Sequence, residues 1–314
     1  MRVTVPSFAK LNLDLRVLNR RPDGYHDLRT IFQTISLKDT LTIEFEAGPR
    51  TRIEIDSSVV IPDNLVARAA RLALDALRVR ALVRFELKKR IPMGAGLGGG
   101  SSNAAAVLAA LPALARKKMA PADLFGLAES LGSDVPFFLR GGTAVGLDRG
   151  TELYPLPDLE AHAALVVSTG IHVSTREAYA ALGRTTLATD RLTSPAASPI
   201  LREFQRVAWA LGSCRLNEIP LTNDFEQVVF EMHPELPALR RKLRRLGAGL
   251  VRMTGSGSAL YGIFESLEQS RAAALRFEAG TAHAVRFLGR RRYGNAWRRA
   301  LGEFALRQPP ISGE

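Results

Sequence analysis

A glycine-rich segment followed by an apolar run constrains this chain more than any other feature of its sequence. Residues 92–103 read Pro-Met-Gly-Ala-Gly-Leu-Gly-Gly-Gly-Ser-Ser-Asn, and five of the seven positions from Gly94 to Gly100 are glycine. Because glycine has no Cβ, several backbone N–H groups can converge on one anion. Residues 83–87 predict a strand before the segment, and residues 103–114 predict a helix after it, whose first amides favour an anion. We therefore expect a phosphate-binding loop, since a serine-capped turn explains only one or two of these glycines.

Three other phosphate loops share parts of this pattern but differ in their surroundings. The spacing of Gly94, Gly96 and Gly99 satisfies the dinucleotide-binding fingerprint, but that motif needs a strand ending in an acidic residue about 20 positions later. Here residues 119–123 predict the start of a helix. The loop lacks the Gly-Lys-Ser/Thr ending of a P-loop, and no His-Arg-Asp or Asp-Phe-Gly motif of the protein kinases follows it. What remains is a loop that ends in paired serines, whose hydroxyl groups can cap the helix or bind phosphate.

The order of strand-like and helix-like segments predicts an α+β fold with mixed strands. Alternating apolar residues indicate the strands, and helical spacing after a capping residue indicates the helices. The expected strands span residues 3–5, 11–17, 41–45, 53–55, 83–87, 143–147, 164–167, 249–253 and 259–264, and the expected helices begin at 64, 103, 122, 175 and 234. A chain of 314 residues fits two domains. The proline-containing stretch 148–160 is the expected boundary, which gives domains 1–152 and 153–314.

Composition argues against several other classes of protein. Cys214 is the only cysteine, so neither an intramolecular disulfide nor a cysteine-based metal cluster can form. The N-terminus lacks the apolar core of a signal peptide. The most apolar stretch, residues 104–115, is shorter than the ~20 residues that span a bilayer. We expect a cytoplasmic protein with no membrane partner.

The chain is basic, with a net charge of +12 from 43 Lys and Arg against 31 Asp and Glu. Part of the excess lies near the C-terminus, in Arg286, Arg290, Arg291, Arg292, Arg298 and Arg299. Such a cluster suits a polyanion, but a solvated basic face has the same composition. Because no RNA-binding motif accompanies the arginines, we do not expect nucleic acid as a partner.

Three segments spread over most of the chain resemble the motifs of the GHMP kinases, which include galactokinase, homoserine, mevalonate and phosphomevalonate kinases. Residues 9–13 (Ala-Lys-Leu-Asn-Leu) resemble the first motif, residues 92–102 the central motif and residues 254–259 (Thr-Gly-Ser-Gly-Ser-Ala) the third. The resemblance implies an ATP-dependent kinase of a small molecule with its active site in the cleft between two domains. The implied N-terminal domain shares its fold type with a ribosomal-protein domain, and the C-terminal domain is ferredoxin-like. The residues implied to bind ATP are Pro92, Met93, Gly94, Ala95, Gly96, Leu97, Gly98, Gly99, Gly100, Ser101 and Ser102.

Further segments resemble one branch of this family, whose substrate is a sugar alcohol that carries a cytidine diphosphate group. They comprise residues 10–13, 20–28, 64–70, 132–138 and 223–226. The resemblance implies phosphorylation of the tertiary 2-hydroxyl group of that substrate in the non-mevalonate isoprenoid pathway. Phe8 departs from the family, which usually has proline there, and residues 183–215 and the arginine-rich end fit poorly.

The resemblance also assigns roles to two charged residues, Lys10 and Asp134. Phosphoryl transfer to an alcohol needs an in-line hydroxyl group, charge stabilisation and a group that accepts the proton. By resemblance Asp134, on a turn between Gly132 and Pro136, is the general base. A lysine in a short apolar strand needs a partner, and the family pairs Lys10 with Asp134, where its ammonium group keeps the carboxylate ionised. The alternatives are an ordinary turn aspartate and an edge-strand lysine that reaches water.

Five residues are candidates for contact with the substrate: Asn12, Tyr25, His26, Thr175 and Tyr179. Tyr25 and His26 can supply an aromatic wall and polar contacts for a cytosine ring. Thr175 and Tyr179 share a helix face, and the family places a pair of this kind at the cytidyl group. Asn12 faces the same side of its strand as the lysine two positions earlier, so we expect it in the same pocket. A packing tyrosine and a helix cap are the alternatives.

The sequence predicts no dedicated metal site. His162, His172, His233 and His283 lack partners at metal-ligand spacing, so we expect them to be surface or structural residues. Mg²⁺ is expected to arrive with ATP, held mostly by phosphates and water. Two other functions stay open: a homoserine-type or mevalonate-type kinase, and a non-catalytic RNA-binding relative that the basic C-terminus would suit. We expect a monomer or a homodimer.

Overall fold

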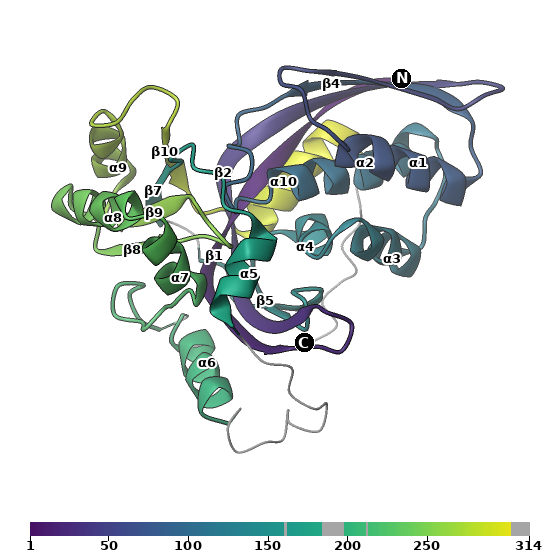
Figure 1. Ribbon diagram of the computed structural model, residues 1–314. Helices are drawn as coiled ribbons and strands as arrows, with labels where there is room; N and C mark the ends of the chain where they lie inside the picture. Colours follow the sequence, from purple (N-terminus) through teal and green to yellow (C-terminus); the bar gives the residue numbers. More distant parts are fainter. Residues whose placement is uncertain (160–161, 184–197, 212, 303–314) are drawn as a thin grey trace.

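The computed structural model describes residues 1–159, 162–183, 198–211 and 213–302, and they form two sheets with helices against each (Figure 1). The first sheet has six strands in the order β3-β4-β2-β5-β6, with β1 paired to β2 off this path. The second sheet has four strands in the order β10-β7-β9-β8. Strands β3 and β4 are parallel and the other pairs are antiparallel. The predicted α+β class with mixed strands is confirmed.

Two long antiparallel strands, β1 (Arg2–Arg20) and β2 (His26–Ala47), form the centre of the first sheet. The sequence pattern predicted only three short strands within this span. The pairing shifts register at two places between Phe8 and Asp14, and such bulges bend a strand and interrupt its simple alternation. Both strands also bury polar side chains, so a pattern based on apolar residues could not find their full length. The other strands of this sheet are β3 (Arg52–Ser57), β4 (Ala81–Lys88), β5 (Thr143–Leu147) and β6 (Glu152–Pro155).

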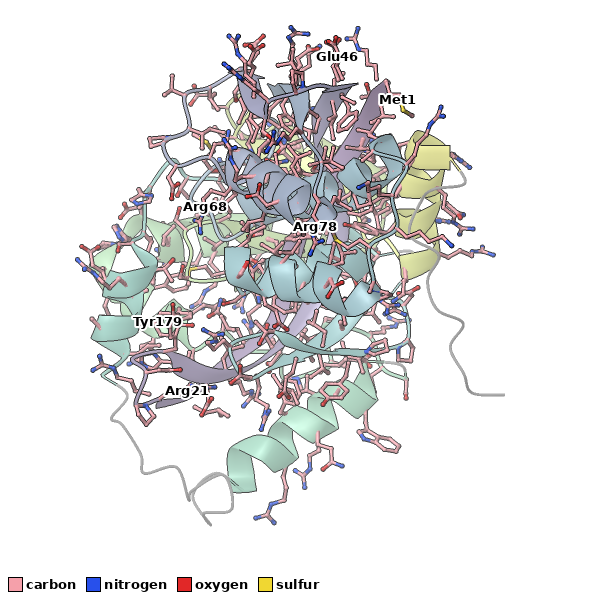
Figure 2. The ribbon with its side chains drawn as sticks, turned by 90° about the vertical axis from the view of Figure 1, so that its right-hand side faces the viewer. Met1, Arg21, Glu46, Arg68, Arg78 and Tyr179 are labelled. Carbon is pink, nitrogen blue, oxygen red and sulfur yellow. The ribbon has the colours of Figure 1, made fainter. Side chains whose placement is uncertain are left out.

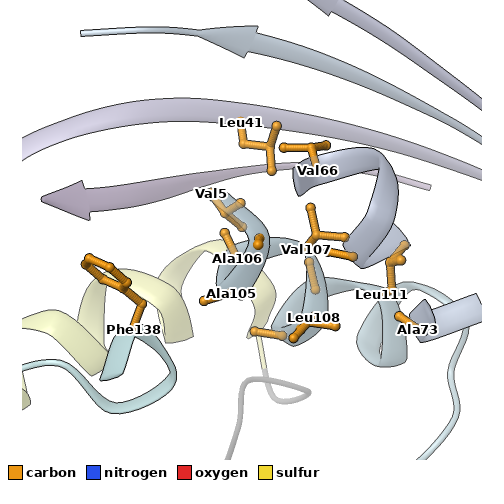
Figure 3. Packing of buried hydrophobic residues seen from close by; sticks show 14 of the residues in the cluster. Val5, Leu41, Val66, Ala73, Ala105, Ala106, Val107, Leu108, Leu111 and Phe138 are labelled. Atoms are coloured by element: carbon orange, nitrogen blue, oxygen red, sulfur yellow. The ribbon is translucent and has the colours of Figure 1, made fainter. Parts of the chain in front are cut away.

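Five helices pack on one face of the first sheet and enclose its core (Figures 1 and 3). Figure 3 shows Val5 and Leu41 of the sheet facing Val66, Ala106 and Val107 of the helices. Burial of such side chains is the main term that holds the helices to the sheet. The five helices are α1 (Leu65–Leu77), α2 (Gly99–Leu114), α3 (Pro121–Leu131), α4 (Val135–Arg140) and α10 (Arg290–Leu301).

Helices α1 and α2 begin differently: a cap was predicted for the first, and an apolar run after the glycine-rich loop for the second. Helix α1 follows Asn64, whose side chain accepts a hydrogen bond from Val66 N at 3.0 Å, as expected. Helix α2 begins at Gly99, one turn before the predicted start at Asn103. Gly98 holds a left-handed backbone (φ 70°) that ends the loop, and the helix follows at once. The two serines after the glycines therefore lie inside the first turn of α2.

The arginine-rich end of the chain forms α10, which returns to the first sheet. Trp297 Nε1 donates a hydrogen bond to Pro6 O at 3.0 Å, and the Tyr293 hydroxyl donates one to Phe138 O. Both aromatic rings are buried, whereas Arg291 and Arg298 are exposed. The exposed arginines of α10 thus occupy its outer face while its inner face completes a core, which agrees with a solvated basic face.

The second sheet carries the other helices, and it joins the first sheet along β1 and β2. Leu15 forms a bridge with Asn223, and Ile35 forms one with Phe287. The strands of the second sheet are β7 (Ala163–Val167), β8 (Leu250–Met253), β9 (Leu260–Phe264) and β10 (Ala282–Arg286). The helices are α5 (Thr175–Leu182), α6 (Ser198–Ala210), α7 (Phe225–Met232), α8 (Glu235–Arg245) and α9 (Leu267–Ala274).

The predicted boundary between residues 152 and 153 falls at the first residue of β6. Strand β6 pairs with β5, so the first sheet extends to Pro155, and α10 adds a later segment to the same half of the molecule. The division of the chain into units 1–152 and 153–314 stays a prediction. Within the described ranges, no helix combines the length and the apolar character that a membrane crossing requires.

Candidate functional site

A cavity of about 1350 Å³ lies between the two halves of the molecule. Its wall is formed by β1 and β2 with their connecting turn, the glycine-rich loop, the turn before α4, the start of α5 and the third glycine motif. Eleven of the predicted residues line it: Lys10, Asn12, Tyr25, His26, Gly94, Gly96, Gly98, Ser101, Asp134, Thr175 and Tyr179. The fold therefore brings together residues that are up to 169 positions apart, from Lys10 to Tyr179.

The backbone of the glycine-rich loop contacts both of the other predicted motifs, residues 9–13 and residues 254–259. Lys10 N donates a hydrogen bond to Leu97 O at 3.0 Å, which ties the loop to β1. Gly96 has φ +75°, and a Cβ atom there would collide with the carbonyl oxygen of Thr254. The three predicted motifs thus meet at one place, and Gly96 is the position where only glycine fits.

The residues of the loop divide between the cavity and the protein core. Ala95 and Leu97 are buried and pack into a hydrophobic cluster, so they can offer only backbone groups to a ligand. Ser101 lines the cavity. Ser102 is fully buried, and within the described part of the chain its hydroxyl group has no hydrogen-bond partner. Ser101 is therefore the only one of the two serines that lines the cavity. The remaining loop residues outside the cavity wall are Pro92, Met93, Gly99 and Gly100.

Lys10 and Asp134 form an ion pair at the wall of the cavity. Lys10 Nζ lies 3.3 Å from Asp134 Oδ2, with the lysine side chain 4% exposed and the aspartate side chain 33% exposed. The same ammonium group lies 5.5 Å from the ring centroid of Phe32. Asp134 precedes α4, on a turn that Val135 N closes by donating to Gly132 O at 3.1 Å. A buried ammonium group beside a half-open carboxylate can stabilise an anion that enters the cavity.

Asn12 connects Lys10 to the surrounding motifs. Its Oδ1 accepts a hydrogen bond from Lys10 Nζ at 2.5 Å, and its Nδ2 donates one to Thr30 Oγ1 at 2.7 Å. The backbone N–H of Asn12 donates to Thr254 Oγ1 at 3.0 Å. The amide is 4% exposed and well satisfied, so its orientation is set by the protein rather than by a ligand.

An aromatic stack forms another part of the cavity wall. The rings of His26 and Tyr179 are 4.6 Å apart with an interplanar angle of 20°. In Figure 2, the labels Tyr179 and Arg21 show that α5 lies beside the turn between β1 and β2. Tyr25 is 55% exposed, and the guanidinium group of Arg149 lies 4.7 Å from its ring centroid. The stack and the exposed Tyr25 ring give the cavity two aromatic surfaces.

Thr175 and Tyr179 both line the cavity from α5, as their shared helix face predicted. The Thr175 hydroxyl lies 3.0 Å from the Ser256 hydroxyl, which joins α5 to the third glycine motif. Burial, and to a smaller extent the charge of Asp134, raises the pKa of Tyr179 to about 12. Tyr179 is therefore a neutral ring with a hydroxyl donor at physiological pH.

Comparison with known proteins places this site in a family. Residues 64–142 match the GHMP kinases N terminal domain, and residues 201–281 match the GHMP kinases C terminal domain. The 4-diphosphocytidyl-2-C-methyl-D-erythritol kinase of Solibacter usitatus is 50% identical over 297 residues, which cover 95% of this chain and 92% of the relative. This chain belongs to that family of GHMP kinases. It is an ATP-dependent kinase of a small molecule.

Solved structures agree with this assignment at two levels. A crystal structure of 4-(cytidine 5'-diphospho)-2C-methyl-D-erythritol kinase has a TM-score of 0.73 and 36% identity, covering 91% of this chain and 99% of that one. A homoserine kinase from Cytophaga hutchinsonii has a TM-score of 0.67 at 18% identity, covering 92% and 95%, which shows a shared fold alone. The predicted two-domain GHMP kinase fold is confirmed.

Sequence reasoning missed three arginines and one histidine in the cavity wall of this kinase. Arg20, Arg149, Arg176 and His172 all line the cavity. His172 was expected at the surface or in a structural role, yet its Nδ1 lies 2.9 Å from the position of a Cβ atom on Gly94. Arg149, Arg176 and His172 stand in turns or at a helix start with no motif around them, so no pattern in one sequence could have found them. Arg20 begins the segment 20–28, but its place in the cavity wall was not predicted. Together these residues make the wall positive.

We expect the kinase to lose stability as the pH falls below 6.5, in part because of His26. Burial, followed by the charge of Arg20, lowers the pKa of His26 from its ordinary value of 6.5. As the pH falls below 6.5, the unfolded chain binds this proton before the folded protein does, so stability present above pH 6.5 is lost. Burial lowers the pKa values of His162 and His283 in the same direction.

The variant His26→Gln should therefore lose less Tm than the wild type between about pH 7.5 and about pH 5.5. We expect a difference of about 1–2 °C in thermal unfolding, because the ring is only partly buried. Equal losses of Tm in the two proteins would contradict this origin of the pH dependence.

Proposed function

We propose that this kinase transfers the γ-phosphoryl group of ATP to the 2-hydroxyl group of 4-diphosphocytidyl-2-C-methyl-D-erythritol, a step of the non-mevalonate isoprenoid pathway. One observation carries the proposal. The ion pair of Lys10 and Asp134 lies in the same cavity as the glycine-rich loop and the stack of His26 on Tyr179. The names of the relatives support the choice of substrate.

ATP is proposed to bind with its phosphates on the glycine-rich loop. Gly94, Gly96 and Gly98 line the cavity, and Ser101 follows them at the start of α2, where backbone N–H groups and the helix dipole favour an anion. Within the described residues there is no group of three or more His, Cys, Asp or Glu side chains that could hold a metal ion. Mg²⁺ would arrive with the ATP phosphates, and the Ser101 hydroxyl and the Asp134 carboxylate, which line the same cavity, are oxygen groups that could help to hold it.

The chemical step needs a base at the hydroxyl group and positive charge at the phosphoryl group. Asp134 Oδ2 accepts the proton of the substrate hydroxyl as its oxygen bonds to the γ-phosphorus and the bond to ADP breaks. Lys10 donates hydrogen bonds toward the charge that spreads over the transferring oxygens. Its ammonium group lies 3.3 Å from Asp134 Oδ2, so both groups can reach the same substrate hydroxyl and phosphoryl group.

The cytidyl group is proposed to occupy the aromatic end of the cavity. The exposed face of Tyr25 and the stack of His26 on Tyr179 suit a cytosine ring, and the cationic residues Arg20, Arg149 and Arg176 suit the diphosphate. The sugar alcohol would then reach the ion pair of Lys10 and Asp134, which lines the same cavity.

The proposal is tested by offering the purified protein ATP, Mg²⁺ and three acceptors: the cytidyl substrate, homoserine and mevalonate. We expect ADP and phosphorylated product with the cytidyl substrate alone. Turnover of homoserine or mevalonate instead would move the protein to another branch of the family. The absence of phosphate transfer to any acceptor would favour the non-catalytic, RNA-binding alternative.

The variant Tyr179→Ala should raise the KM for the cytidyl substrate by about 10-fold or more, because stacking of a base on an aromatic ring contributes about 1–3 kcal/mol. The KM for ATP should change little, since the proposed phosphate site is the glycine-rich loop and not this ring. Tyr179→Phe keeps the ring and should recover most of the loss. Tyr154→Ala, at an exposed tyrosine of β6 outside the cavity wall, is the matched control. An unchanged KM in Tyr179→Ala would remove this ring from the cytidyl site.

A further inference from the structure

A buried asparagine just before α7 holds the third glycine motif in place without lining the cavity. Asn223 is 4% exposed, and its Nδ2 donates hydrogen bonds to Met253 O and to Gly255 O, each at 2.9 Å. Its Oδ1 accepts a hydrogen bond from Phe225 N at 3.0 Å. Its backbone forms a bridge with Leu15 of β1. Both hydrogens of the amide are therefore used, and the side chain spans the junction between the third motif and the first strand.

The two carbonyl groups that Asn223 binds lie on either side of Thr254. Thr254 is fully buried, and its Oγ1 accepts a hydrogen bond from Asn12 N at 3.0 Å. The same hydroxyl lies 3.3 Å from Gly96 O, so it can donate its hydrogen to the glycine-rich loop. A threonine held at both neighbouring residues in this way cannot shift without moving the backbone of β1 or of the loop.

Asn12 connects Thr254 to the ion pair of Lys10 and Asp134. Its Oδ1 accepts a hydrogen bond from Lys10 Nζ at 2.5 Å, and that ammonium group lies 3.3 Å from Asp134 Oδ2. We propose that Asn223 is a positioning residue for phosphoryl transfer, acting through Thr254 and Asn12 on the ammonium group of Lys10. This inference rests on the roles proposed above for Lys10 and Asp134.

The physical reason lies in the lysine itself. A lysine side chain is a flexible stem with a point charge, and its hydrogen bonds to neighbours determine where that charge stands. A misplacement of about 1 Å in a reacting group can lower a rate about 100-fold. Asn223 does not line the cavity, so a change there affects the reaction only through Thr254 and Asn12.

The variant Asn223→Asp keeps nearly the same side-chain shape but replaces the amide donor by a carboxylate oxygen. That oxygen would face the carbonyl oxygens of Met253 and Gly255 and could not donate to them. We expect kcat to fall by about 10- to 100-fold, while the KM values for ATP and for the cytidyl substrate change by less than about 3-fold. Asn217→Asp makes the same chemical change at an exposed asparagine and should leave both parameters unchanged. An unchanged kcat in Asn223→Asp would overturn the proposal.

A double-mutant cycle separates this relay from simple destabilisation. Thr254→Val removes the hydroxyl group and should also lower kcat, and Thr254→Ser should recover most of that loss. If Asn223 acts through Thr254, the double variant Asn223→Asp with Thr254→Val should lose clearly less than the product of the two single losses. Losses that multiply would show that the two residues act independently and would overturn the relay. Should Asn223→Asp fail to fold, Asn223→Ser, which removes both hydrogen bonds without adding charge, takes its place in the cycle.

A measurement that does not depend on catalysis, NMR of the lysine ammonium groups, tests this inference separately from the proposed function. In protein labelled with ¹⁵N at the lysine side chains, the ammonium resonance of Lys10 can be assigned by its loss in Lys10→Arg. We expect Asn223→Asp to move or broaden that resonance and Asn217→Asp to leave it in place. A wild-type enzyme inactive on the cytidyl substrate would overturn the proposed function, whereas an unmoved Lys10 resonance would overturn the positioning role alone.

Discussion

The variant Asp134→Asn is expected to lower kcat by about 100- to 10,000-fold, the range that a positioned general base contributes. The amide has nearly the shape of the carboxylate but cannot accept the proton of the substrate hydroxyl. The ammonium group of Lys10, 3.3 Å from Asp134 Oδ2, would also lose its counter-charge. Because the variant removes a proton acceptor rather than a binding surface, the KM for the cytidyl substrate should change little. Steady-state kinetics over a range of both substrates measures the two parameters.

The matched control for this variant is Asp75→Asn, at an exposed position of α1 outside the cavity wall. It should retain the wild-type kcat. If Asp134→Asn retained near-full kcat, Asp134 would not be the general base. The ion pair would then act only through its charge, and the kcat of Lys10→Met would measure that contribution.

The variant Gly96→Ala should lower kcat by about 100-fold and raise the KM for ATP by about 10-fold or more. Gly96 has φ +75°, a region that costs an L-residue about 1–2 kcal/mol, and a Cβ atom there would meet the carbonyl oxygen of Thr254. That oxygen belongs to a backbone held on both sides by Asn223, so it cannot yield as a flexible side chain would. The loop must move away from the third motif, and its phosphate-binding groups move with it.

Gly126→Ala is the control for this second variant. Gly126 lies inside α3, with no atom within 4 Å of a Cβ placed there, and alanine favours a helix interior over glycine by about 1 kcal/mol. It should therefore leave the kinetics unchanged and raise Tm slightly. Wild-type kinetics and Tm in Gly96→Ala would mean that the loop and the third motif do not pack this closely in solution.

Local structure was predictable wherever a single segment contains its own signal. The strand at residues 83–87, the cap at Asn64 and the helix ending at Gly132 appear in the structure close to where the pattern placed them. The long strands β1 and β2 were not predictable in full, because bulges and buried polar residues interrupt the alternation of apolar residues. The early start of α2 was missed because glycines are poor helix formers, yet here they begin the helix at the end of the loop.

The candidate site also contains residues that were predictable from the sequence and residues that were not. The glycine-rich loop was readable because five glycines in seven positions have one economical explanation, a backbone that must approach an anion. The resemblance to the GHMP kinases then implied Lys10 and Asp134, which no local pattern could have joined. Arg149, Arg176 and His172 carry no motif, and only the packing of the two halves brings them to the cavity wall.

The sequence by itself therefore determined a glycine-rich loop at a helix start, an α+β fold and, through its resemblance to the GHMP kinases, a kinase of a small molecule. These properties depend on residue types within short segments, above all on glycines where no side chain fits. Only the tertiary structure decided that Lys10 meets Asp134, that His26 stacks on Tyr179 and that Asn223 supports the third motif. Each of these depends on how two separate sheets pack along β1 and β2, and that packing is a property of the whole core rather than of any one segment.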